Sequence, residues 1–195
     1  KTAGFFKKSY FGIKDLTIID DKIFLSFSNE IKENCFNTGI LIAALDLNNL
    51  NFEKHSLSES DCAPVGDMDN ALQGGRIVKL SDKEIFFTHG DWFQGSSAQD
   101  KKSIFGKILK YNFINKSIEM ISYGHRNPQG LLYLKEQNIL VETEHGPIGG
   151  DEVNIIKLDD TSEDKNYGWP IASYGKGTQK NAGVISSGTK SYKSH

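Results

Sequence analysis

Residues 124–131 read Gly-His-Arg-Asn-Pro-Gln-Gly-Leu, and two further polar, glycine-rich motifs follow at short intervals. Residues 144–154 read Glu-His-Gly-Pro-Ile-Gly-Gly-Asp-Glu-Val-Asn, and residues 166–170 read Asn-Tyr-Gly-Trp-Pro. Between the motifs lie short apolar runs, at 131–134 and 139–141, which have the length expected of β-strands. The stretch therefore predicts strands that hold apart polar, chemistry-bearing loops.

Strand-like runs recur along the rest of the chain in three sets of four. The first set spans about residues 11–60, the second about 74–123 and the third about 127–173. Short polar turns, such as the one at 20–22, join the runs and indicate antiparallel neighbours. Four antiparallel strands form one blade of a β-propeller. We therefore predict an all-β chain in which residues 1–195 form one domain of about three four-stranded blades.

Three segments carry more specific expectations. The polar residues 29–38 are typical of a loop, and 169–173 are expected to form the last strand of the third set. Residues 175–195 are rich in Gly, Ser, Lys and Thr, which is typical of a loop leading toward a further blade. Because a closed propeller typically has about four to eight blades, three cannot close the ring. We expect a fragment, completed by a second copy or by the missing blades.

Composition excludes several classes of function. The 195 residues are 37% hydrophobic and 25% charged, and no apolar run approaches the ~18 residues that would indicate a membrane span. The formal net charge is −2, with lysines and acids interspersed, so no basic surface for nucleic acid is expected. Nineteen glycines against four prolines favour many tight turns.

The three motifs, in this order and at this spacing, resemble those of the glucose/sorbosone dehydrogenases. These are six-bladed β-propellers that include the soluble, quinone-dependent sugar dehydrogenases. The resemblance is good from Leu72 onward and rests on strand pattern alone before Cys62. It implies PQQ- and calcium-dependent oxidation of an aldose at the anomeric carbon, by a protein that is periplasmic or secreted.

The first motif supplies the candidate cofactor residues. Arg126 has an always-charged guanidinium that donates in a fixed fork, which suits an oxyanion or a polarised carbonyl. The resemblance places Arg126 beside the quinone, and Asn127 and Gln73 in contact with the cofactor. The plainer interpretation is that Arg126 pairs with an acid while 128–130 turn the chain.

The second motif is acidic and glycine-rich, which favours oxygen ligation of a hard cation. The resemblance assigns calcium to the backbone carbonyls of Gly146 and Pro147. Asp151 and Glu152 could instead fix the loop through hydrogen bonds to its backbone. In the third motif, Trp169 is expected in the core.

The catalytic base is where the sequence departs from the family pattern. Asp91 matches the aspartate that orients the base, although it could simply end a strand with an Asx turn. Counting nineteen residues back from Asp91, to where the family carries its catalytic histidine, gives Leu72, which cannot accept a proton. His89 lies two residues before Asp91 and hence on the same strand face, so it is a candidate substitute. A local structural hydrogen bond is the plainer role for His89.

Two hypotheses for function follow. The first is a sugar dehydrogenase in which Arg126, Asp91 and His89 serve catalysis; the second is a non-catalytic propeller that binds carbohydrate or protein, which Leu72 favours. The resemblance places further quinone-binding lysine and arginine residues in later blades, so we expect this chain alone to bind PQQ weakly. Cys35 and Cys62 could form a disulfide or remain buried thiols, and the resemblance favours the disulfide.

Overall fold

The computed structural model describes residues 12–64, 71–161 and 164–175, and regular structure in these ranges is almost all β-strand. The strands form three antiparallel sheets. The first contains β1 (Ile13–Ile19), β2 (Lys22–Lys32), β3 (Cys35–Ala44), β4 (Glu53–His55) and the short β5 (Ala63–Pro64), which pairs with β3. The second contains β6 (Gly74–Lys79), β7 (Glu84–His89), β8 (Lys107–Asn112) and β9 (Ile118–Tyr123). The third contains β10 (Pro128–Leu134), β11 (Ile139–Glu144) and β12 (Glu152–Lys157).

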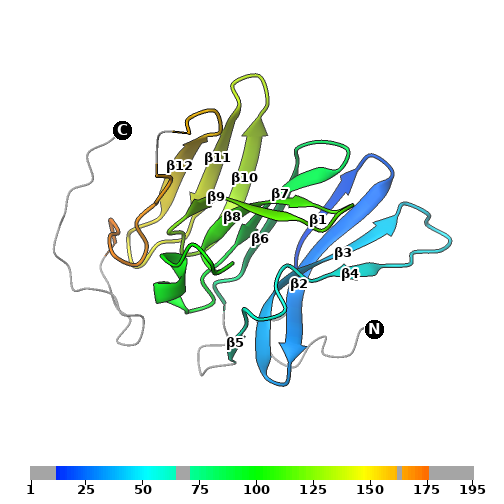
Figure 1. Cartoon of the computed structure of the whole chain (residues 1–195), viewed down its shortest axis with the longest axis horizontal. Coiled ribbons are helices and arrows are strands. Elements are labelled where there is room, and N and C mark those ends of the chain that lie inside the picture. Colours follow the sequence, from blue (N-terminus) through cyan, green and yellow to red (C-terminus); the bar gives the residue numbers. More distant parts are fainter. Residues whose placement is uncertain (1–11, 65–70, 162–163, 176–195) are drawn as a thin grey trace.

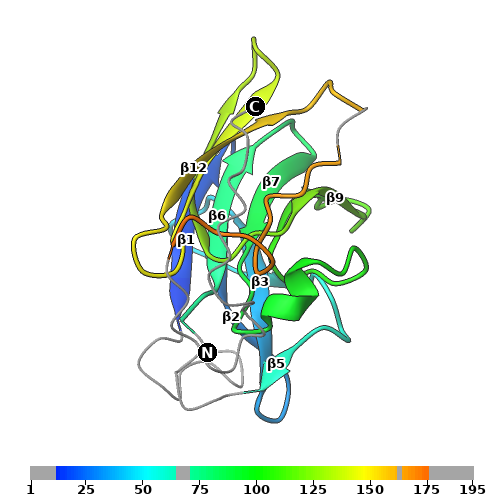
Figure 2. The same cartoon turned by 90° about the vertical axis from the view of Figure 1, so that its left-hand side faces the viewer.

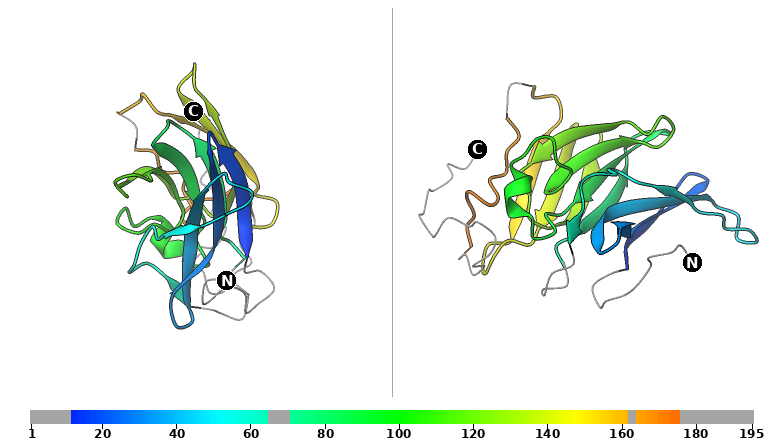
Figure 3. Two further views of the ribbon diagram at one scale, coloured as in Figure 1. Left: turned by 90° about the vertical axis from the view of Figure 1, so that its right-hand side faces the viewer. Right: turned by 60° about the horizontal axis from the view of Figure 1, so that its bottom comes forward.

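The sheets follow one another in sequence order along the long axis of the molecule, as Figure 1 shows. Their first strands are neighbours, because β6 lies against both β1 and β10. Arg76 joins all three strands: its Nη1 donates to Asp15 at 2.8 Å and its Nε donates to the carbonyl of Gln129 at 2.9 Å. Figures 2 and 3 show the twisted sheets from the side. This is the blade arrangement of a partial propeller, so the predicted fold class is confirmed.

The middle sheet packs against a neighbouring sheet on each of its two faces. Alternate residues of β7 point to opposite faces and take part in both contacts. Phe87 packs with Phe24 and Ile40 of the first sheet. Phe86 packs with Leu140 and Ile156 of the third. The continuous apolar run in β7 therefore holds the two outer sheets against the middle one, and this packing fixes where the strand-end loops lie.

Two segment predictions were wrong. Residues 29–38 are mostly strand, because β2 and β3 continue to a turn at 33–34. Three polar side chains of this hairpin are buried: the Asn29 side-chain amide donates to Asn37 at 3.2 Å, and Thr38 Oγ1 donates to the carbonyl of Gln73 at 2.8 Å.

Residues 169–173 form a turn rather than a strand. The backbone N–H of Trp169 donates to the carbonyl of Gly124 at 2.9 Å, which ties this segment to the first motif instead of to β12. The third sheet therefore has three strands within the described ranges. Of the loop expected at 175–195, only Gly175 lies within the described residues.

Cys35 and Cys62 form a disulfide, with their Cα atoms 5.2 Å apart, so the structure contains the first of the two alternatives for these cysteines. The bond joins the start of β3 to the segment before β5. Among the described residues, no helix has the length and apolar character that crossing a membrane requires.

Candidate active site

The loops that follow β7, β9 and β11 meet at one end of the sheets. The backbone N–H of Asp91, after β7, donates to the carbonyl of Arg126 at 2.8 Å. The N–H of His145, after β11, donates to the carbonyl of Asn127 at 3.2 Å. With Trp169 bonded to Gly124, the three sequence motifs and the end of β7 form one site.

Arg126 lies at the centre of this site. Its Nη1 donates to the carbonyls of His145 and Gly146, at 2.9 and 2.8 Å, and its guanidinium lies 5.3 Å from the ring centroid of Trp169. Its Nε is buried and has no hydrogen-bond partner among the described residues. A buried donor without an acceptor is costly, so this atom is suited to a carbonyl or anionic oxygen of a ligand.

Asp91 is buried beneath Arg126 and holds the tryptophan in place. Its Oδ2 accepts the indole N–H of Trp169 at 2.7 Å, and its Oδ1 accepts the N–H of Phe93 at 2.9 Å. The bond to Phe93 is the Asx turn of the plainer interpretation. Burial raises the pKa of Asp91 to about 7, against the lowering effect of its two donors.

Leu72 lies beside the end of β7, next to Asp91 in space as the resemblance implies. Its carbonyl accepts the N–H of Trp92 at 2.9 Å. The approach to Gly90 is so close that a Cβ on Gly90 would lie 2.2 Å from the Leu72 oxygen. The side chain of Leu72 is buried and apolar, so this position has no proton acceptor.

His89 is fully buried, and both of its ring nitrogens have partners. Nδ1 donates to the carbonyl of Gly90 at 2.8 Å, and Nε2 accepts the N–H of Thr38 at 3.2 Å. Burial lowers the pKa of His89 to about 3. The geometry agrees with a structural hydrogen bond and gives this side chain no path to a substrate.

Asn127 and Gln73 are also buried and bonded to the chain. Asn127 Oδ1 accepts the N–H of Gly74 at 3.1 Å, and Gln73 Oε1 accepts the hydroxyl of Ser28 at 2.6 Å. These bonds link β10 to β6 and the start of β6 to β2. Both side chains thus help to hold the strand ends together.

The carbonyls of Gly146 and Pro147, to which the resemblance assigns calcium, both accept hydrogen bonds from the protein. The Gly146 carbonyl accepts from Arg126, and the Pro147 carbonyl accepts the N–H of Gly150 at 2.8 Å. Asp151 accepts the N–H of Gly146 at 3.2 Å, which is the loop-fixing role of the plainer interpretation. Beside this loop is a pocket of about 270 Å³, lined by Gln129, Thr143, Glu144, His145, Asp151, Glu152 and Val153.

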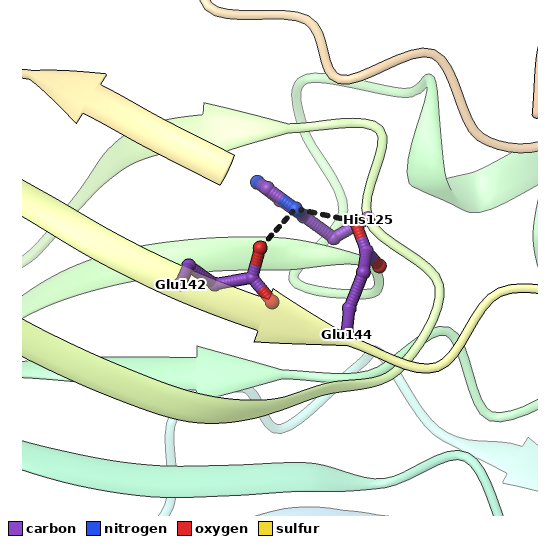
Figure 4. A group of neighbouring side chains, drawn as sticks. All are labelled: His125, Glu142 and Glu144. Carbon is purple, nitrogen blue, oxygen red and sulfur yellow. Dashed lines mark hydrogen bonds and ion pairs between the residues drawn. The ribbon is translucent and has the colours of Figure 1, made fainter. Parts of the chain in front are cut away.

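Sequence reasoning missed a buried group formed by His125, Glu142 and Glu144, which Figure 4 shows with the side chains facing one another. Glu144 Oε2 accepts the backbone N–H groups of Arg126 and Asn127, at 2.6 and 3.3 Å, so this carboxylate positions the first motif. Burial and the neighbouring Glu144 raise the pKa of Glu142. The signal in the sequence was Glu142-Thr143-Glu144, because acids two residues apart in a strand share a face.

A family model described as Glucose / Sorbosone dehydrogenase matches residues 12–193. The chain belongs to this family. The aldose sugar dehydrogenase YliI of Escherichia coli strain K12 is 38% identical over 115 residues, which cover 52% of this chain and 30% of that protein.

Solved structures agree with the family match. A glucose dehydrogenase superimposes with a TM-score of 0.70 at 27% identity, over 86% of this chain and 52% of its own. The PQQ-bound aldose sugar dehydrogenase of Streptomyces coelicolor superimposes with a TM-score of 0.57 at 28% identity, over 83% of this chain and 47% of its own. The chain therefore spans about half the length of these structures.

Proposed function

We propose that this chain is part of a PQQ- and calcium-dependent sugar dehydrogenase that oxidises an aldose at its anomeric carbon. The observation that supports the proposal most is the Nε donor of Arg126, buried without a partner among the described residues at the meeting point of the three family motifs. The family match and the PQQ-bound relative supply the chemical class. A bound quinone would supply the acceptor for the hydride that leaves the sugar.

In this proposal Arg126 binds a carbonyl or developing oxyanion through Nε, while Nη1 stays on the carbonyls of the 145–146 loop. Trp169 supports the guanidinium from one side, and Asp91 fixes the indole. Asn127 and Gln73 shape the floor of the site, because their hydrogen bonds set the positions of the strand ends.

Calcium enters the proposal through Gly146 and Pro147, the residues that the resemblance assigns to it. An ion at the Gly146 carbonyl would share that oxygen with the guanidinium of Arg126 and be repelled by its charge. We therefore expect weak calcium binding at this loop in the wild type.

A non-catalytic propeller that binds carbohydrate or protein is the second candidate. The observation in its favour is the pair formed by Leu72, which offers no base, and His89, whose ring nitrogens are both engaged within the core. A well-placed general base typically contributes about 10²–10⁴-fold, so we expect slow turnover if PQQ binds.

Absorbance titration with PQQ, with and without calcium, tests the proposal on the longest natural form of the protein. We expect saturable binding in the wild type and a loss of at least about tenfold in affinity in Arg126→Met, since a charge-assisted hydrogen bond contributes about 1.5–3 kcal/mol. Lys101→Met is the matched control, because Lys101 forms an exposed ion pair with Asp164 away from Arg126. Absence of PQQ binding would overturn the dehydrogenase proposal and leave the binding-module candidate.

We also propose a periplasmic or secreted location, which the Cys35–Cys62 disulfide supports because such bonds persist in oxidising compartments. The proposed partners are a sugar and either a second copy of the chain or further blades. The exposed apolar faces of the outer sheets support association of this kind.

A further inference from the structure

The buried group of His125, Glu142 and Glu144 concentrates negative charge inside the third sheet. All three side chains are buried, and their nearest nitrogen and oxygen atoms lie within 4.8 Å of one another. His125 Nδ1 lies 3.2 Å from Glu144 Oε1 and 3.9 Å from Glu142 Oε2. Two carboxyl groups buried this close to one another need a proton or a compensating positive charge at this depth.

An unpaired oxygen shows that donors from the described residues do not complete the group. Glu142 Oε1 is buried and has no hydrogen-bond partner among the described residues, and the Glu142 side chain is 0% exposed. Figure 4 shows the other oxygen of this carboxylate, Oε2, turned toward the imidazole of His125. Oε2 of Glu142 accepts from the Asn154 amide at 3.0 Å, and a proton on Oε1 would find no acceptor among the described residues.

The surroundings of the three side chains are those of a metal site. His125 Nε2 lies 2.8 Å from Ser122 Oγ, so a tautomer that donates to Ser122 leaves the lone pair of Nδ1 facing the two carboxylates. Tyr167 stacks on the imidazole with a centroid distance of 4.9 Å and fixes its plane. The Asn154 amide donates to both carboxylates, at 3.0 and 3.2 Å, and orients them.

We propose that His125, Glu142 and Glu144 bind one divalent transition-metal ion of the zinc type. Metal–ligand bonds of about 2.0–2.2 Å place tetrahedral ligands about 3.3–3.6 Å apart, and His125 Nδ1 lies 3.2 Å from Glu144 Oε1. Glu142 Oε2, at 3.9 Å from His125 Nδ1, would have to move closer to join such a site. The imidazole nitrogen favours zinc or a similar transition metal over calcium, which takes oxygen ligands.

A pocket beside Glu144 gives a cation access to the buried group, and binding there would affect the first motif. The pocket of about 270 Å³ reaches Glu144 and carries the acids Asp151 and Glu152 on its wall, which attract cations toward the group. Because Glu144 also holds the backbone of Arg126 and Asn127, the ion would fix the first motif to the end of β11. This metal site is separate from the calcium loop at 146–147 and does not depend on the dehydrogenase proposal.

Zinc and cobalt titrations of the longest natural form, after treatment with a chelator, test the proposal. We expect one tightly bound equivalent of Zn²⁺, a cobalt absorption spectrum of low coordination number, and a higher melting temperature with Zn²⁺ than in chelator. In Glu142→Gln, which keeps the side-chain shape but removes a ligand charge, we expect zinc affinity to fall about 100-fold and the zinc-dependent rise in melting temperature to vanish.

Two controls separate this site from surface binding. His145→Gln removes the exposed histidine beside Asp151, and Glu119→Gln removes an exposed acid on β9; both should bind zinc as the wild type does. A far-ultraviolet circular dichroism spectrum matching the wild type would establish that Glu142→Gln is folded. The proposal fails if the wild type binds no stoichiometric zinc, or if folded Glu142→Gln binds it with unchanged affinity.

Discussion

Arg126 combines three interactions that the sequence motif alone does not specify. Its backbone N–H is held by Glu144, its Nη1 by the 145–146 loop, and its guanidinium plane by Trp169. The motif predicted that Arg126 and Asp91 belong to one site, and the structure brings them together through Trp169. The sequence could not predict that the indole of Trp169 joins the two residues, because the contact of Trp169 with Asp91 spans 78 positions in the chain.

His89 illustrates the limit of reasoning from strand periodicity. Its parity with Asp91 was correctly read, since the two share the end of β7, but periodicity does not say whether a face meets solvent or a neighbouring sheet. Here β3 covers that face, and Thr38 donates to the imidazole. Burial by another blade is a tertiary effect with no local signal.

The buried imidazole of His89 should make the stability of the protein depend on pH. Because the folded pKa is about 3 and the unfolded pKa about 6.5, the unfolded state binds one more proton between these values. Stability should therefore decrease as pH falls below about 6.5, by up to about 1.4 kcal/mol per pH unit from this group. In His89→Gln, urea unfolding between pH 7 and 4.5 should show a shallower pH dependence.

His145→Gln, which removes an exposed imidazole instead of a buried one, is the matched control for this measurement. Equal slopes in the wild type and in His89→Gln would show that the buried imidazole is not the source of acid sensitivity.

Apolar runs located the middle strands well, and polar composition misled at residues 29–38. The strands β6 to β9 lie within the stretch of about 74–123 that was predicted to hold four strands, because apolar runs between short polar turns define them. The hairpin of β2 and β3 was missed because its asparagine, serine and threonine side chains bond to one another and to Gln73 inside the protein. Buried polar networks have no signature in a single sequence.

The Cys35–Cys62 disulfide should contribute to the free energy of unfolding. Cys35 and Cys62 are separated by 27 residues, and closing a loop of that length lowers the entropy of the unfolded chain enough to contribute about 3.5 kcal/mol. The double variant Cys35→Ala/Cys62→Ala should lose about this much free energy of unfolding in urea. Wild-type protein unfolded in a reducing buffer should lose a similar amount, and unchanged stability in both would contradict the assignment.

The first and third sheets, the two outer sheets of the molecule, each expose apolar side chains. On the third sheet, Leu132, Val153 and Ile155 are 54%, 70% and 59% exposed. On the first sheet, Leu16 and Ile18 are 61% and 54% exposed. The middle sheet shows what such faces normally do, since both of its faces are covered by neighbours. Exposed outer faces agree with the prediction from the sequence that three blades cannot close into a ring.

These surfaces predict self-association of the 195-residue chain. Light scattering coupled to size-exclusion chromatography should give a mass that rises with protein concentration, because exposed apolar faces bury one another. Val153→Lys/Ile155→Lys should shift the distribution toward monomer, whereas Lys157→Glu, an exposed polar change on the same strand, should not. A monomer at all concentrations would contradict this account of the outer faces.

We propose that Leu72 occupies the position of the catalytic base in a scaffold of the glucose/sorbosone dehydrogenase family. Dye-coupled aldose oxidation by the longest natural form, with saturating PQQ and calcium, tests this claim most directly when the wild type, Leu72→His and Leu72→Gln are compared. The account predicts that Leu72→His raises turnover at least about 100-fold while Leu72→Gln, polar but not basic, does not. No gain in folded, PQQ-bound Leu72→His, or a wild type that already matches its rate, would contradict it.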